Sequence, residues 1–171
     1  MQQVNQMAEE EFVSVFGGVF ENSPHIARLA RHAGPFRDLA RLHQALCLVV
    51  ERLSVEAKEA LIGAHPDLVG RAALMGTLSA ESTREQASAG LDNLTGAEVA
   101  RFGELNHLYR SKFGFPFVIC ARENKKESIL AGMEARLPNS REREIDTAMR
   151  EIGKIAWLRL LDLVEDNGEE G

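Results

Sequence analysis

Cysteine is scarce in this chain, and the sequence shows no sign of export. The 171 residues include two cysteines, Cys47 and Cys120. Two thiols are too few for a disulfide framework or for a zinc site made of four cysteines. The first residues contain neither the basic segment nor the apolar segment of a secretory signal. We therefore expect a cytoplasmic protein in which both cysteines are reduced residues of the core.

Long apolar runs and an excess of basic charge are also missing. The longest apolar run, residues 115–121, has seven residues and contains Pro116, whereas a helix needs about 20 apolar residues to cross a bilayer. The 20 basic residues are outnumbered by 26 acidic ones, which gives a formal net charge of -6. Such a charge provides no general attraction to nucleic acid or to anionic lipid. We expect neither a nucleic-acid partner nor a membrane partner.

The residues that are abundant favour helices. Leu, Ala, Glu and Arg dominate, while β-branched residues rarely cluster. No linker, repeat or low-complexity tract interrupts the sequence. The composition predicts an all-α protein with a single-domain helical bundle of about seven to nine helices over residues 1–166. Residues 167–171 are expected to form a flexible acidic tail.

Apolar periodicity and start signals place these helices along the chain. Ser-Pro at residues 23–24 predicts a helix start, Ser54 predicts another, and Thr-Gly-Ala-Glu at residues 95–98 matches a capping box. Asn139 and Glu142 are expected to cap the last helix. Gly and Pro within residues 113–119 predict a loop. The expected helices are residues 6–19, a short helix ended by Gly-Pro at 34–35, and residues 36–53, 54–62, 95–112, 124–136 and 140–165.

Arg159 occupies an unusual position in the last predicted helix. At about 100° per residue, Ile145, Ile152, Ala156 and Leu163 lie on one apolar stripe, and Arg159 falls in its middle. One interpretation is structural, with the guanidinium reaching water or pairing with a carboxylate of the protein. The other is functional, because a guanidinium in an apolar wall is suited to bind an anionic ligand.

His65 is the second candidate for chemistry. Pro66 disfavours helical geometry at the preceding residue, so His65 is expected at a break between a helix and a loop. An imidazole there can act as a general acid or base near neutral pH, although a structural histidine fits the same pattern. No spacing typical of a metal site occurs among the other four histidines, which are His25, His32, His43 and His107.

Two further segments allow both a structural and a functional interpretation. Ser82 and Glu85 match a capping box, but a helix start also suits an anionic ligand, with Glu85 and Gln86 facing a cleft. Residues 114–121 can form a turn through the core, or their backbone groups can bind the amides of a ligand. A nucleophilic Cys120 is a third interpretation, without a basic neighbour in sequence to support it.

Taken together, these motifs resemble the OHCU decarboxylase family of urate catabolism. OHCU is 2-oxo-4-hydroxy-4-carboxy-5-ureidoimidazoline, and the family converts it to (S)-allantoin without a cofactor. The resemblance implies an all-helical, usually homodimeric carboxy-lyase that takes a small anionic substrate and holds no metal. The motifs are His65-Pro66-Asp67-Leu68, Ser82-x-x-Glu85-Gln86-x-x-Ala89-Gly90-Leu91, Leu105-Asn106-x-x-Tyr109-x-x-Lys112 with its continuation to Ala121, and Glu151-Ile152-x-x-Ile155-Ala156-x-x-Arg159-Leu160.

The resemblance also implies which residues form the site. His65 corresponds to the catalytic histidine of the family, and we expect Glu85 and Arg159 to act with it. Under this hypothesis Arg159 orients the anionic substrate, and His65 delivers a proton to one face. The substrate-binding positions implied are Pro66, Ser82, Gln86, Phe117, Val118, Ile119, Cys120 and Ala121.

A helical protein-interaction module is the alternative from another functional class. Residues 157–164 are apolar nearly all round, as expected for a helix that docks another chain. If the protein is an enzyme, we expect a cleft that contains His65, Glu85 and Arg159. If it is a binding module, we expect these three residues to lie apart.

Overall fold

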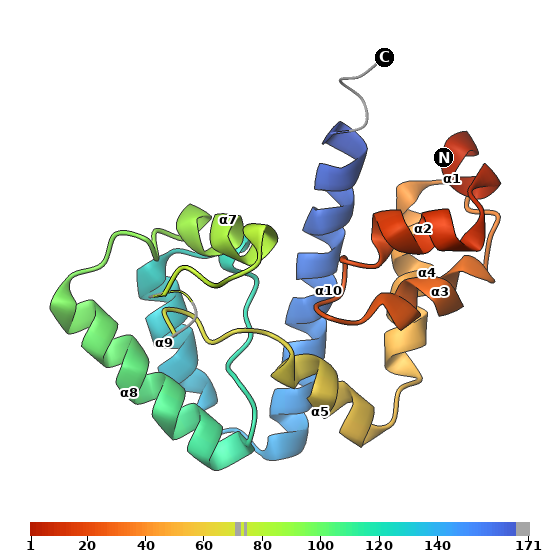
Figure 1. Cartoon of the computed structure of the whole chain (residues 1–171). Helices are drawn as coiled ribbons and strands as arrows, with labels where there is room; N and C mark the ends of the chain where they lie inside the picture. Colours follow the sequence, from red (N-terminus) through yellow and green to blue (C-terminus); the bar gives the residue numbers. More distant parts are fainter. Residues whose placement is uncertain (71–72, 74, 167–171) are drawn as a thin grey trace. The chain divides into compact units, whose positions relative to one another are not determined.

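The computed structural model describes residues 1–70, 73 and 75–166 of the chain (Figure 1). All regular secondary structure in this part is helical, with nine α-helices of defined bounds and one 3-10 helix. The prediction of an all-α fold is confirmed. No helix among these residues combines the length and the apolar composition of a membrane span. The predicted tail at residues 167–171 lies outside the described residues.

Contacts within the chain define two compact units, Met1–Leu61 with the chain from Gly153 onward, and Ile62–Ile152. The first unit contains α1 (Gln2–Gln6), α2 (Glu9–Phe16), α3 (Pro24–Arg31) and α4 (Leu39–Glu51), as well as most of α5 (Val55–Gly63). Helix α3 packs against both α2 and α4 (Figure 1). Large side chains fill the core of this unit, among them Phe12, Ile26, Leu42 and Leu46. The organisation of residues 1–166 as one domain stays a prediction.

Local signals fixed some of these helix starts correctly and missed others. Pro24 is the first residue of α3, as predicted. The predicted helix at residues 6–19 is wrong in two respects. The extended backbone at Ala8 separates α1 from α2, and α2 ends at Phe16. Three glutamates follow in the first turn of α2, where the helix dipole favours negative charge. Helix α4 begins later than predicted, since the Asp38 side chain caps it by accepting from the Arg41 N–H at 2.8 Å.

The second unit contains α7 (Ala80–Ser88), α8 (Gly96–Phe113), the 3-10 helix η1 (Ala121–Glu123), α9 (Lys126–Arg136) and the first part of α10 (Arg141–Asp166). Helix α8 packs against α9, and α7 packs against η1 (Figure 1). The capping box of Thr95 and Glu98 is confirmed. Gly114 ends α8 with a φ of 83°, a left-handed conformation that glycine adopts at little cost. The predicted loop follows it.

The cap of α10 differs from the prediction. The Ser140 hydroxyl accepts from the Arg143 N–H at 3.3 Å, so Ser140 occupies the capping position. Asn139 instead donates from Nδ2 to Glu144 Oε1 at 2.6 Å. Its amide therefore bonds to the buried Glu144 carboxylate within the first turns of α10, and the expected pair of Asn139 with Glu142 is wrong.

A buried polar network centres on Glu144, whose side chain is fully buried. Its carboxylate accepts hydrogen bonds from the Tyr109 hydroxyl and, at 2.9 Å, from Arg136 Nε. Burial and the bond to Glu144 both raise the pKa of Tyr109, which keeps the hydroxyl protonated as a donor. Arg136 also donates from Nη1 to the Val118 carbonyl at 2.8 Å. Through these hydrogen bonds the network connects the loop after α8 to helices α8, α9 and α10.

Candidate functional site

His65 lies two residues after the end of α5, in the break that Pro66 predicts. The residue is 7% exposed, so the break does not leave it in solvent. The backbone N–H of His65 donates to the Ile62 carbonyl at 3.1 Å, which connects the residue to the last turn of α5. The sequence therefore predicts the position of His65 correctly, and its burial is a finding of the structure.

Helix α7 starts earlier than the capping-box pattern indicated. Ser79 is its N-cap, and the Ser79 hydroxyl accepts from the Ser82 N–H at 3.1 Å. Ser82 is consequently the third residue of the helix, and the predicted capping box of Ser82 with Glu85 is wrong. Glu85 therefore does not cap the helix at Ser82.

The buried face of α7 is polar, which is uncommon for a helix of this length. Ser82 is 4% exposed and Gln86 is 6% exposed, one turn apart. Gln86 Oε1 accepts from the Val69 N–H at 3.1 Å, which links α7 to the turn that follows His65. Among the described residues no hydrogen bond reaches Gln86 Nε2, so this donor is available to a ligand.

The backbone of residues 117–121 is partly used by the protein itself. Glu151 accepts from the Cys120 N–H at 2.8 Å, and Asn124 donates to the Cys120 carbonyl at 2.9 Å. In the described structure neither the N–H nor the carbonyl of Ile119 has a hydrogen-bond partner. Of the backbone groups expected to bind a ligand, those of Ile119 are therefore available, whereas those of Cys120 are occupied.

The Cys120 thiol is unsuited to act as a nucleophile. Burial raises its pKa to about 11, and the charges of Glu123, Glu151 and Glu85 add to the effect. At neutral pH such a thiol is almost entirely protonated. Helix α7, which carries Glu85, packs against η1 directly after Cys120.

Arg159 belongs to the first unit, whereas His65 and Glu85 belong to the second. Arg159 is 5% exposed and pairs with Glu21, with 3.0 Å between Nη1 and Oε2. Its Nη1 also donates to the Gly18 carbonyl at 3.3 Å. This contact agrees with the structural interpretation of Arg159, in which a carboxylate of the protein pairs with the guanidinium. A role in substrate binding then requires Arg159 to act as part of an existing ion pair.

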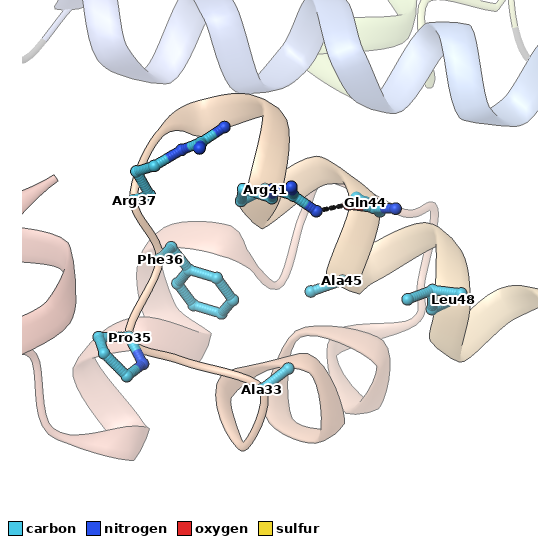
Figure 2. A pocket seen from close by; sticks show the side chains of 8 residues that line it. All are labelled: Ala33, Pro35, Phe36, Arg37, Arg41, Gln44, Ala45 and Leu48. Atoms are coloured by element: carbon cyan, nitrogen blue, oxygen red, sulfur yellow. Dashed lines mark hydrogen bonds between the residues drawn. The ribbon is translucent and has the colours of Figure 1, made fainter.

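A cavity of about 330 Å³ lies in the first unit, and its lining contains no predicted site residue (Figure 2). The ring of Phe36 and the side chains of Ala45 and Leu48 form apolar parts of its wall. Arg41 lies at its edge and donates to Gln44 Oε1 at 2.8 Å. In the part of the chain that the structure describes, no three His, Cys, Asp or Glu side chains gather as metal ligands.

The sequence pattern of the family described as OHCU decarboxylase matches residues 5–161. The chain belongs to the OHCU decarboxylase family. A relative from Amia calva, called 2-oxo-4-hydroxy-4-carboxy-5-ureidoimidazoline decarboxylase, is 42% identical over 165 residues, which are 96% of this chain and 94% of the relative. A protein of the same name from Xenopus laevis is 38% identical, with 94% of this chain and 91% of the relative covered.

Two solved structures are similar to the fold of this chain. A crystal structure of (S)-allantoin synthase superimposes with a TM-score of 0.76 at 28% sequence identity, covering 95% of this chain and 53% of that one. A second crystal structure, of OHCU decarboxylase in the presence of (S)-allantoin, has a TM-score of 0.69 at 22% identity and shows the shared fold. Both solved structures thus share the helical fold of this chain.

Proposed function

We propose that this member of the OHCU decarboxylase family removes the carboxylate of 2-oxo-4-hydroxy-4-carboxy-5-ureidoimidazoline and yields (S)-allantoin. The observation that carries the proposal is the 42% identity to a relative of that name over 96% of the chain. The positions of His65, Ser82, Glu85 and Gln86 in the second unit support it. We extend the proposal to a cytoplasmic homodimer on the strength of the family resemblance.

The substrate itself can accept the electrons of the reaction. When the bond to the carboxylate carbon breaks and CO₂ leaves, the electron pair passes into the adjacent C=N bond of the ring. The ring nitrogen of that bond takes up a proton, and the hydroxyl group loses its proton and becomes a carbonyl. The ring carbon that bears the ureido group takes up a further proton, so one proton is consumed overall for each CO₂ released. The protein has to orient the substrate, stabilise the developing charge and deliver this proton to one face. A cofactor that serves as an electron sink is not required by this chemistry.

We assign the roles accordingly. His65 supplies the proton, because an imidazole can both hold and release one in general acid catalysis. Glu85 and the available Gln86 amide hold the hydroxyl or ureido group of the substrate. Ile119 contributes its unpartnered N–H and carbonyl. Arg159 interacts with the negative charge of the substrate. The neighbouring positions Pro66, Ser82, Phe117, Val118, Cys120 and Ala121 are assigned to the walls of the site.

The proposal is tested by adding the protein to freshly generated substrate. Circular dichroism follows the handedness of allantoin, and ultraviolet absorbance follows the disappearance of the substrate. We expect accelerated decay and an excess of the (S) enantiomer. Racemic allantoin formed at the uncatalysed rate would contradict the proposal.

Glu85→Gln is expected to lower kcat/KM at least about tenfold, which corresponds to about 1.4 kcal/mol of transition-state stabilisation. The amide presents a donor where the carboxylate accepts, so it mismatches a substrate hydroxyl or N–H group. The melting temperature should change little, because Glu85 is half-buried and does not cap α7. Glu81→Gln, at an exposed position of the same helix, is the matched control. Full activity of Glu85→Gln would remove this residue from the mechanism.

Arg159→Met is expected to raise KM and to lower the free energy of unfolding by about 2–3 kcal/mol, because it leaves the Glu21 carboxylate without its partner. The double variant Glu21→Gln/Arg159→Met should recover much of the stability, since no buried charge remains. Urea unfolding and steady-state kinetics separate the two roles of the guanidinium. A double variant that regains both stability and KM would show that Arg159 has a structural role only.

A further inference from the structure

The segment after His65 forms a turn that is unusually tight. The Gly70 N–H donates to the Asp67 carbonyl at 3.2 Å. A Cβ added at Gly70 would lie 2.6 Å from the Asp67 Cβ, so only glycine fits there. Val69 is buried and has a φ of 53°, in the left-handed region that β-branched residues rarely adopt. A strained turn of this kind persists only where the surrounding structure holds it.

Two buried hydrogen bonds hold this turn from outside. Asn106 donates from Nδ2 to the Leu68 carbonyl at 2.8 Å, across 38 residues of sequence. The Val69 N–H donates to Gln86 Oε1 at 3.1 Å. The two bonds fix the carbonyl and the N–H on either side of the bond between Leu68 and Val69. They therefore determine the orientation of the peptide plane next to the strained φ of Val69.

A third contact comes from the same face of α8 as Asn106. Arg110, one turn further along the helix, places Nε 2.9 Å from both carboxylate oxygens of Asp67. This ion pair is partly exposed, so it holds the turn less firmly than the buried bonds do. The turn that follows His65 is thus attached to α7 through Gln86 and to α8 through Asn106 and Arg110.

The two polar atoms of the Asn106 side chain differ in whether they have a hydrogen-bond partner. Asn106 is 8% exposed, and its Oδ1 is a buried atom without a hydrogen-bond partner among the described residues. An unsatisfied buried acceptor costs free energy, so stability alone does not favour an amide at this position. The group that the structure uses is the Nδ2 donor, and its use is to hold the Leu68 carbonyl.

We propose that Asn106 is a positioning residue, whose Nδ2 donor fixes the turn at Leu68 and thereby the orientation of the His65 imidazole. The inference rests on the proposed function, in which His65 is the proton donor. A proton donor that is displaced by about 1 Å transfers its proton much more slowly, while the contacts that bind the substrate remain. Loss of the Asn106 donor should consequently lower kcat far more than it changes KM.

Asn106→Leu is the most informative variant. Leucine has a similar size, removes the Nδ2 donor and also removes the unsatisfied Oδ1, so the gain and the loss in stability partly offset each other. We expect a melting temperature within about 5 °C of the wild type. We expect kcat to fall about 10- to 100-fold, KM to stay within about threefold, and the pH profile of kcat to shift. Asn106→Ala, measured in the same way, provides a second variant in case leucine disrupts the fold.

Asn5→Leu is the matched control. Asn5 donates from Nδ2 to the Phe36 carbonyl at 2.8 Å, which is the same kind of bond in the first unit. The substitution Asn5→Leu should lower the melting temperature and leave kcat unchanged. The inference is overturned if kcat of both Asn106 variants stays within twofold of the wild type, or if Asn5→Leu lowers kcat to the same extent.

A measurement without turnover separates this inference from the proposed function. Nuclear magnetic resonance of ¹⁵N-histidine reports the His65 ring directly. We expect its signals to shift in Asn106→Leu and to stay in place in Asn5→Leu. Unchanged His65 signals in both variants would contradict the role of Asn106. A wild-type protein without decarboxylase activity would contradict the proposed function, and the shift of the ring signals would still test the turn.

Discussion

Replacing Glu144 with alanine should lower the free energy of unfolding by about 3–5 kcal/mol, because it leaves a largely buried guanidinium without its carboxylate. The Arg136 side chain is 13% exposed, and Glu144 Oε2 is 2.9 Å from it. The Tyr109 hydroxyl and the Asn139 amide lose their acceptor as well. Each donor left unsatisfied adds to the loss. Urea unfolding followed by far-ultraviolet circular dichroism measures the change.

Two further variants test the reason for this loss. Glu142→Ala removes an exposed glutamate from the first turn of the same helix and should cost less than about 1 kcal/mol. Arg136→Met/Glu144→Leu removes both charges together and should recover a large part of the stability. If Glu144→Ala unfolds at the urea concentration of the wild type, the network does not contribute to the stability of the fold.

The elements that could be predicted from sequence are those determined by neighbouring residues. Pro24 at a helix start and the capping box of Thr95 with Glu98 depend on contacts three residues apart or fewer. Other local signals were misleading. The pattern of Ser82 with Glu85 predicted a helix start at Ser82, whereas α7 is capped by Ser79, so Ser82 lies in its first turn on the buried side. The burial of that face is decided by tertiary packing.

The partners of the site residues could not be predicted for a similar reason. Arg159 and Glu21 are 138 residues apart, and nothing near either residue in the sequence indicates the pair. Gln86 was expected to bind substrate, but its Oε1 is used to hold Val69. The chemistry of each residue type could therefore be inferred from the sequence. Which of its polar atoms already bond to other groups of the protein depends on the fold and could not be inferred.

His65→Asn should lower kcat by a factor of about 10² to 10⁴, the usual contribution of a general acid, which equals about 2.7–5.5 kcal/mol of the barrier. Asparagine is polar and similar in size to part of the imidazole, so the turn after α5 should still form. Because asparagine has no group that releases a proton near neutral pH, the ring carbon of the substrate must take its proton from water. KM should change by less than about threefold, since the groups that bind the substrate remain.

The handedness of the product distinguishes loss of the proton donor from general damage to the site. Water approaches both faces of the ring, so the residual turnover of His65→Asn should yield allantoin with a reduced excess of the (S) enantiomer. His107→Asn is the matched control, because His107 is an exposed histidine of the same unit. It should retain the rate and the product of the wild type. A His65→Asn variant with kcat within twofold of the wild type and undiminished enantiomeric excess would assign the proton transfer to another group.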